Sequence, residues 1–427
     1  MTRGDNQIPA EAREGELGSS YNAVIPADVL TPGVRMFVEV DSDGDLPLTA
    51  ESRTRFPATG SDSLRIVEVP PLQLTLVPVL EEAAPDTSIL AWVRGVSAES
   101  PQVGLLKHSF PLAEFSVRPR DPFYTSLDIT TTAGQVALFG ELEALRTAEG
   151  GRGYYYGVAA DLGSVGGRGQ LPGWVSIGVP SPYTLTHEVG HNVSLRHAPC
   201  GNPPGVNPVF PYPDGSIGVW GYDFRSGSVM SPDRSEDIMT YCRTRPWISD
   251  YHYRNVISHR AALARGIARA GMTAADRPSD MLVLWGGVAD GELQLEPVYS
   301  TQATPRLPEE RGPYRITGIG SDGRTLWALD FTPGEDGHGG RHFFFMVPIE
   351  PDWEDSLDRI VLTGSEGQVA VDREDERAIT VVTERGTGRI RAILRDWDGA
   401  LPAGLRGGEG LEIATTRGLG EAVRLRR

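Results

Sequence analysis

The chain has 427 residues, of which 39% are hydrophobic and 23% charged, and its formal net charge is −17. These values are typical of a globular protein with two or three domains, and the abundance of Gly and Pro favours β-rich, loop-rich domains over a helical bundle. The negative charge argues against nucleic acid as a partner, and no run of 18 apolar residues predicts a membrane-spanning helix.

The first 69 residues are typical of short strands separated by turns. Residues 34–40 (VRMFVEV) are rich in β-branched and aromatic side chains, and the turn-forming DSDGDLP follows them. We therefore expect residues 1–69 to form a β-rich N-terminal module, such as a small β-sandwich or a prodomain. The N-terminus lacks the apolar segment of a signal peptide, so the chain either stays inside the cell or begins after a removed leader.

Residues 70–270 alternate between strand and helix patterns. The expected strands are LQLTLVPVL, AEFSVRP, GYYYGVAADL and GWVSIGVP, and the expected helices are residues 87–100 and 134–150. In the second helix, Val136, Phe139, Leu142 and Leu145 lie three residues apart on one face. A further helix is expected to begin after Ser181, an N-cap residue followed by proline. The pattern predicts an α/β domain.

The remaining segments differ in character. Residues 198–236 are rich in Pro, Gly and Asp and predict a long ordered loop, and another helix is expected from Ser249. Residues 275–427 contain regularly spaced strand patterns such as MLVLWGGV, TLWALDF and HFFFMVPI, which predict a C-terminal β-sandwich. The fold class is therefore multidomain α+β, with an α/β domain between two β-rich modules.

The segment THEVGHNVSLRH contains three of the eight histidines of the chain. In a helix, His187 and His191 lie on the same face and can bind one metal ion together. Glu188 lies about 100° further round the helix, from where it can reach a metal-bound water without binding the metal. Imidazoles suit zinc, and three protein ligands with one open position are typical of a catalytic zinc site.

The third ligand distinguishes two zinc-site designs. One design takes a glutamate from a later helix, but the first glutamate after Glu188 is Glu236, and no suitable helix precedes it. The other design takes a histidine six residues after the second one, where His197 stands. Asp214 and Asp223 are competing third ligands without support from spacing.

HEVGHNVSLRH resembles the metzincin zinc endopeptidase signature HExxHxxGxxH, and DIMTY (residues 237–241) resembles the Met-turn of that clan. The resemblance covers about residues 72–270 and is closest to bacterial secreted metzincins. It implies a zinc ion held by His187, His191 and His197, with Glu188 as general base. It also implies that Met239 lies beneath the metal and that Tyr241 lies beside it.

One residue departs from this signature, because Ser194 stands where the family usually has glycine. That position requires a left-handed backbone conformation, which costs a residue with a Cβ roughly 1 kcal/mol or more. The serine is consistent with a tolerated substitution, a shifted turn or an inactive site. Cys200 and Cys242 lie near the two halves of the expected site, which suggests one disulfide and an exported protein.

The leading hypothesis is a secreted zinc endopeptidase whose substrate lies extended along an edge strand at residues 173–179. Residues 242–247 are expected to line the pocket just beyond the cleaved bond. The alternative is an adhesion, glycan-binding or protein-binding protein with an inactive metzincin-like domain.

The remaining histidines and the acidic segments carry weaker signals. His252 and His259 are expected to be core or surface residues, and His108, His338 and His342 have no partner at ligand spacing. EPDWEDSLD and DSDGDLP are acidic enough to bind Ca²⁺, but neither matches an EF-hand loop. The acidic composition of these segments would allow a structural calcium site, but no motif supports one.

Overall fold

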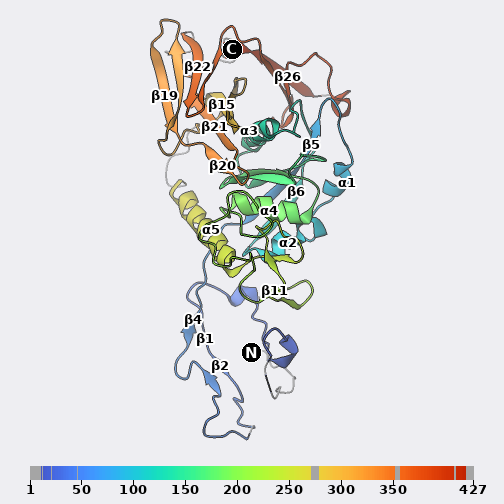
Figure 1. The fold of residues 1–427 in the computed structure, drawn as a ribbon, viewed down its shortest axis with the longest axis vertical. Helices are drawn as coiled ribbons and strands as arrows, with labels where there is room; N and C mark the ends of the chain where they lie inside the picture. Colours follow the sequence, from blue (N-terminus) through green and yellow to red (C-terminus); the bar gives the residue numbers. More distant parts are fainter. Residues whose placement is uncertain are drawn as a thin grey trace.

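The computed structural model describes residues 11–419 except for residues 12, 21 and 46 and the segments 271–277, 352–355 and 408–409. A mixed sheet forms its centre (Figure 1). The central strands are β5 (Leu72–Glu81), β6 (Phe115–Pro119), β7 (Phe123–Thr125), β8 (Tyr154–Val158), β9 (Gly167–Leu171) and β10 (Val175–Gly178). All of them run parallel except β9, which is antiparallel to β10.

Two helices cover opposite faces of this sheet. Helix α3 (Thr132–Ala148) packs with Val77 and Val79 of β5, whereas α4 (Pro182–Asn192) packs with Leu74 and Leu76 of the same strand. Because both faces are covered, β5 is apolar along almost its whole length. The four apolar residues predicted to share one face of α3 are all buried.

The other helices differ in part from the sequence expectation. Residues 87–100 were expected to form one helix, but only α1 (Ile89–Val93) is helical, because Gly95 turns the chain with a φ of +71°. The next helix, α2 (Pro101–Ser109), was not predicted. Helix α5 (Asp250–Ala270) begins directly after Ser249, as expected. In the described residues, no helix is long and apolar enough to cross a membrane.

Strands of the C-terminal part form two packed sheets, but they also join the central sheet. The strands are β15 (Ser279–Ala289), β16 (Glu292–Leu295), β17 (Tyr299–Ala303), β18 (Tyr314–Gly320), β19 (Thr325–Phe331), β20 (Gly334–Asp336), β21 (Arg341–Pro348), β22 (Leu357–Gly364), β23 (Gly367–Asp372), β24 (Ala378–Glu384), β25 (Ile390–Arg395) and β26 (Leu411–Arg417). The sheet β19-β18-β22-β23 shares a core with β15 and β21, as a sandwich would.

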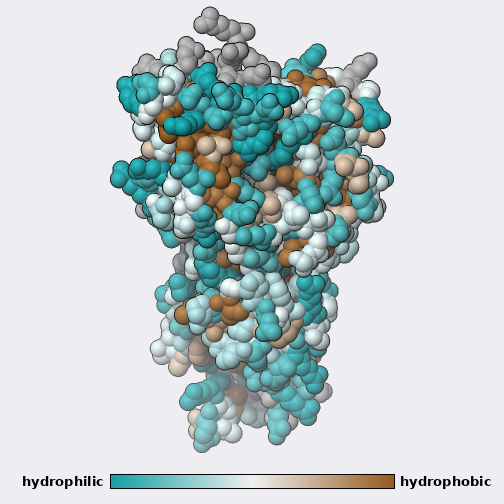
Figure 2. All heavy atoms as spheres, turned by 45° about the horizontal axis from the view of Figure 1, so that its top comes forward, coloured by the Kyte–Doolittle hydropathy of each residue, from teal (hydrophilic) through white to brown (hydrophobic). Residues whose placement is uncertain are grey.

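The same C-terminal strands extend the central sheet at both of its edges. Strand β20 pairs with β9 at one edge, and β25 pairs with β7 at the other. Helix α3 packs between the two parts, and Gly140 lies so close to Trp285 that a Cβ would be 2.2 Å from its ring. The C-terminal sandwich is therefore continuous with the α/β part. Figure 2 shows that end of the molecule, with hydrophobic residues gathered among hydrophilic ones.

The N-terminal segment contains short strands but no core. Its elements are two 3₁₀ turns (Leu17–Ser19 and Ala27–Val29) and the strands β1 (Arg35–Met36), β2 (Val38–Glu39), β3 (Arg55–Phe56) and β4 (Asp62–Ser63). The strands pair only as β1–β4 and β2–β3, and no described residue before Leu72 is buried. Figure 1 shows this part extending away from the rest. The expected sandwich does not form here, because too few apolar side chains meet to build one.

The edge of the central sheet differs from the sequence expectation. Residues 173–179 were expected to be an edge strand, but β10 has β8 on one side and β9 on the other. Strand β9 (GRGQL) was not predicted, because it has neither an apolar alternation nor β-branched residues before Leu171. The outer side of β9 pairs with β20.

Candidate metal centre

Helix α4 places two histidines on its buried face. The Ser181 side chain accepts a hydrogen bond from the backbone N–H of Thr184, and Pro182 occupies the first turn, so the helix begins as the sequence predicts. His187 and His191 are buried, and their ring centroids are 5.0 Å apart. The helix thereby presents both imidazoles to one point.

Ser194 ends the helix in a left-handed conformation with a φ of +75°. The N–H of Ser194 donates to the carbonyl of His191 at 2.8 Å, and the N–H of Leu195 donates to that of Gly190 at 3.0 Å. These two bonds form a Schellman motif, which is usually built on glycine. The sharp turn forms despite the serine, and it returns the chain so that His197 faces the helix.

The three imidazoles of His187, His191 and His197 converge. Each has a nitrogen atom within 4.8 Å of the others, and the Nε2 atoms of His187 and His197 are 3.1 Å apart. Each Nδ1 atom faces a backbone carbonyl, at 2.9 Å for His187, 2.7 Å for His191 and 2.5 Å for His197. These carbonyls orient the Nε2 atoms towards one point, as in metal-binding histidines.

The electrostatics of the cluster suit a cation. Nε2 of His191 is buried and has no hydrogen-bond partner. Burial lowers the pKa of His187 to about 3 and also lowers the pKa values of His191 and His197, so the imidazoles are neutral at pH 7, the form that binds a metal. The donor set therefore fits a metal ion.

Glu188 lies beside this cluster. Its side chain is buried, and its Oε2 atom has no hydrogen-bond partner. Burial raises the pKa of its carboxyl group well above the ordinary value, although the guanidinium of Arg168 opposes that rise. Gly167 of β9 allows the close approach, because a Cβ there would be 2.7 Å from Cγ of Glu188.

The DIMTY segment packs beneath and beside the histidines. A Cβ on Gly190 would be 2.6 Å from Sδ of Met239, and the Met239 carbonyl accepts the N–H of Ala198 at 3.0 Å. The ring of Tyr241 lies 5.1 Å from that of His197 and 6.0 Å from that of His187, measured between centroids. Met239 thus packs against the helix that carries His187 and His191, and the Tyr241 ring lies beside His187 and His197.

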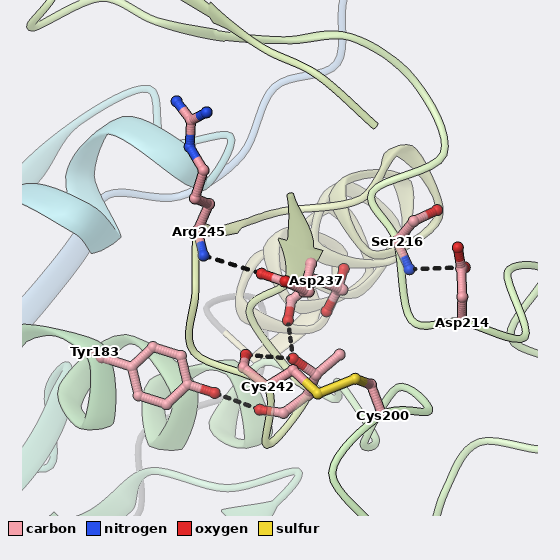
Figure 3. The surroundings of a disulfide bond; sticks show 9 residues. Tyr183, Cys200, Asp214, Ser216, Asp237, Cys242 and Arg245 are labelled. Atoms are coloured by element: carbon pink, nitrogen blue, oxygen red, sulfur yellow. Dashed lines mark hydrogen bonds between the residues drawn. A yellow bond between two sulfur atoms is a disulfide. The ribbon is translucent and has the colours of Figure 1, made fainter. Parts of the chain in front are cut away.

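A disulfide joins Cys200 to Cys242 (Figure 3). The backbone N–H of Tyr241 also donates to the carbonyl of Cys200 at 3.0 Å. The segment after the third histidine is therefore fixed to the DIMTY segment both covalently and by hydrogen bonding.

The competing third ligands lie outside the cluster. Asp214 accepts the N–H of Ser216, and Asp223 pairs with Arg225. Among the described residues, the two groups that could hold a metal ion both include His191. The Ca²⁺ expectation gains no support, and part of EPDWEDSLD lies outside the described residues.

The sequence did not identify His338 as part of this site. A nitrogen of its ring, a nitrogen of His191 and a carboxylate oxygen of Glu188 all lie within 4.8 Å of one another. Its Nδ1 atom is 3.2 Å from the hydroxyl of Tyr241. His338 stands 141 residues after His197 in the chain, so no local spacing could have indicated it.

A cavity of about 240 Å³ adjoins the centre, and it is lined by His187, Glu188, Tyr241, His338 and Arg243 among others. Arg243 lies 4.8 Å from the ring centroid of Tyr183. Residues 242–247 were expected to line such a pocket, and Arg243 is the member of that segment that does so.

Comparisons with known proteins agree with this chemistry. Residues 127–255 match the family described as Peptidase M66, whose members depend on a metal ion. A Dictomallein-like protein of Hahella chejuensis is 38% identical over 69 residues, which is 16% of this chain and 11% of that protein. The chain thus matches about a tenth of the length of that relative. The two matches support a metallopeptidase.

A solved structure described as a chaperone–substrate complex is 12% identical, with a TM-score of 0.26, over 48% of this chain and 39% of that chain. This likeness is too low to define a shared fold.

Proposed function

We propose that the chain is a secreted zinc endopeptidase of the metzincin type. The observation that carries this proposal is the convergence of three oriented imidazoles beside a buried, unpartnered carboxylate oxygen of Glu188. His187, His191 and His197 hold the ion. The Cys200–Cys242 disulfide supports secretion, because disulfides persist in oxidising compartments.

A bound zinc ion supplies Lewis acidity, which polarises the scissile carbonyl and lowers the pKa of a bound water to about 7. Glu188 accepts a proton from the attacking water and then donates it to the leaving amine. Burial raises the pKa of Tyr241 to about 12, so its hydroxyl stays protonated and donates a hydrogen bond to the oxygen that becomes negative. Met239 supports the histidines from below.

The alternative of a binding protein with an inactive site is not favoured. Burying the carboxyl group of Glu188 without a hydrogen-bond partner costs free energy. This cost is explained by a catalytic role beside the oriented imidazoles, whereas an inactive binding domain offers no explanation for it.

The test measures zinc content and cleavage of casein by wild type, Glu188→Gln and His191→Ala. We expect one zinc ion per chain in wild type and Glu188→Gln, and at least a 100-fold loss of cleavage in Glu188→Gln. His191→Ala loses the zinc. Glu99→Gln is the matched control, because Glu99 is an exposed residue paired with Lys107. Bound zinc with no cleavage, either by wild type or by the Arg196→Glu variant described below, contradicts the proposal.

A further inference from the structure

The segment 334–340 (GEDGHGG), which we call the strap, crosses the metal centre from the C-terminal part of the chain. Within it, β20 pairs antiparallel with β9, with Glu335 opposite Leu171 and Asp336 opposite Gln170. The N–H of Gly337 then donates to the carbonyl of Gly169 at 3.3 Å. An extended peptide that adds a strand to a sheet makes this same kind of ladder. The strap therefore occupies the outer side of β9, where a peptide substrate would add.

The strap also contacts the residues that perform the proposed reaction. Gly337 lies so near His191 that a Cβ would be 2.3 Å from its Nε2 atom, the nitrogen that faces the metal position. His338 follows directly, and its Nε2 atom is buried with no hydrogen-bond partner. The ring centroid of His338 is 5.6 Å from that of His197. The strap thus covers the ligands and does not merely border them.

Two ion pairs and a turn hold the strap in place. Arg168 of β9 binds Asp336 at 2.7 Å, and both side chains are buried. Oδ1 of Asp336 also accepts the N–H groups of His338 and Gly340, each at 2.8 Å, which fixes the turn. On the surface, Arg196 binds Glu335 at 2.8 Å.

The strap divides the space around the metal centre. On one side is the cavity that includes Glu188 and Tyr241, and on the other is a cavity of about 250 Å³ that includes His191 and His197. His338 lines the cavity that includes Glu188, and Gly337 lines the cavity that includes His197. A peptide that spans both cavities has to pass through the position of these two residues.

We propose that the strap is an intramolecular, substrate-like inhibitor. This inference rests on the proposed peptidase function. It means that the folded chain has no peptidase activity while the strap is paired with β9. Cleavage then requires the exchange of one antiparallel partner of β9 for another, together with breakage of the buried Asp336–Arg168 ion pair.

The principal test locks the strap in place. Leu171→Cys with Glu335→Cys puts two cysteines opposite each other on paired strands, where a disulfide can form. We expect the oxidised double variant to bind zinc as wild type does but to cleave casein at least tenfold more slowly. Mild reduction restores cleavage, and wild type under the same reductant is the control. Equal cleavage by the locked and reduced forms overturns the proposal.

A second variant loosens the strap from the surface. Arg196→Glu replaces the attraction to Glu335 by repulsion, and we expect cleavage to increase several-fold. Arg324→Glu is the matched control, because it reverses the charge of an exposed arginine that pairs with Asp322 on the β18–β19 turn. An unchanged rate in Arg196→Glu, together with unimpaired cleavage by the locked form, rejects the strap.

A third measurement does not depend on activity. In Glu188→Gln with zinc bound, a casein-derived peptide is added and hydrogen exchange of residues 334–340 is followed. We expect these amides to lose protection when the peptide binds, and peptide binding with unchanged protection contradicts the inference.

The failure of the proposed function and the failure of the strap give different results. Absence of cleavage by wild type, by Arg196→Glu and by the reduced double variant refutes the proposed function. Equal cleavage by the locked and reduced forms refutes the strap alone.

Discussion

Nδ1 of His252 lies 2.8 Å from Oδ1 of Asp237, and both side chains are fully buried. The Asp237 carboxylate also accepts the N–H groups of Met239 and Ser249, each at 2.8 Å. One side chain therefore connects the DIMTY segment to the start of α5. The pair supports the metal centre from a distance, because it fixes the backbone on which Met239 and Tyr241 stand.

Asp237→Asn is expected to lower the free energy of unfolding by about 3 kcal/mol at pH 7, because it neutralises a buried carboxylate that accepts hydrogen bonds from His252, Met239 and Ser249. Burial raises the pKa of Asp237, but His252 and the hydrogen bonds outweigh burial and leave the pKa below its ordinary value. This contribution is therefore complete above the unfolded pKa of about 3.9 and is lost as the pH falls through the lower folded pKa.

Urea unfolding between pH 3 and pH 7 measures this difference. The two stability curves should approach each other only below about pH 4. Asp330→Asn, which removes an ion pair with Arg315 at the surface, is the control and should leave the stability almost unchanged. A constant difference between wild type and Asp237→Asn down to pH 3 argues against a stabilising role of the ionised Asp237 carboxylate.

Ser194→Gly is expected to stabilise the chain by roughly 0.5 to 1 kcal/mol. Ser194 is exposed and has a positive φ, so glycine removes backbone strain and loses no packing. Ser194→Val should destabilise it, because a β-branched residue tolerates this conformation poorly. Thermal unfolding of the two variants, with zinc content measured in parallel, checks both signs. Destabilisation by glycine would show that the serine makes a compensating interaction.

Removal of the metal is expected to lower the melting temperature of wild type. A ligand that binds only the folded state contributes about 4 kcal/mol at 1,000 times its dissociation constant. A chelator should have little effect on His191→Ala, which has already lost its metal. His259→Ala serves as the matched control, because His259 lies on α5 outside the cluster and should leave the response intact. A chelator response that survives in His191→Ala would place the metal elsewhere.

Arg243 is expected to favour an acidic side chain on the leaving side of the cleaved bond. It supplies a guanidinium to the cavity that Glu188 and Tyr241 line. Arg243→Glu should reverse a preference of roughly tenfold, which corresponds to about 1.4 kcal/mol. The measurement is a peptide library that varies this one position.

Arg245→Glu is the control for this prediction, because the Arg245 side chain points away from the disulfide in Figure 3. Equal rates for acidic and basic peptides with wild type would exclude this role of Arg243.

The clustering of the three histidines was predictable, because these residues are close in the sequence. The spacing of His187, His191 and His197 reflects one helix and one turn, and the resemblance of DIMTY to a Met-turn indicated Met239 and Tyr241. These features depend on local backbone geometry, which residue spacing encodes directly.

The covering of the site was not predictable. Strand β9 is glycine-rich because Gly167 and Gly169 face α4 at close range. A glycine-rich segment lacks the side-chain pattern by which a strand is predicted from sequence. His338 reaches the centre only through the pairing of β20 with β9. Such a contact depends on the register of strands far apart in the chain, which no local pattern records.

The Cys200–Cys242 disulfide affects how freely the segment between the two cysteines can change in length. The bond closes residues 200–242 into a ring in the unfolded chain as well as in the folded one. Lengthening an open loop costs about 0.6 kcal/mol per doubling, but a ring that is already closed does not incur this closure cost again on folding. The exposed turns of the segment between the third histidine and the DIMTY segment can therefore lengthen at little closure cost, while its two ends stay fixed beside the histidines.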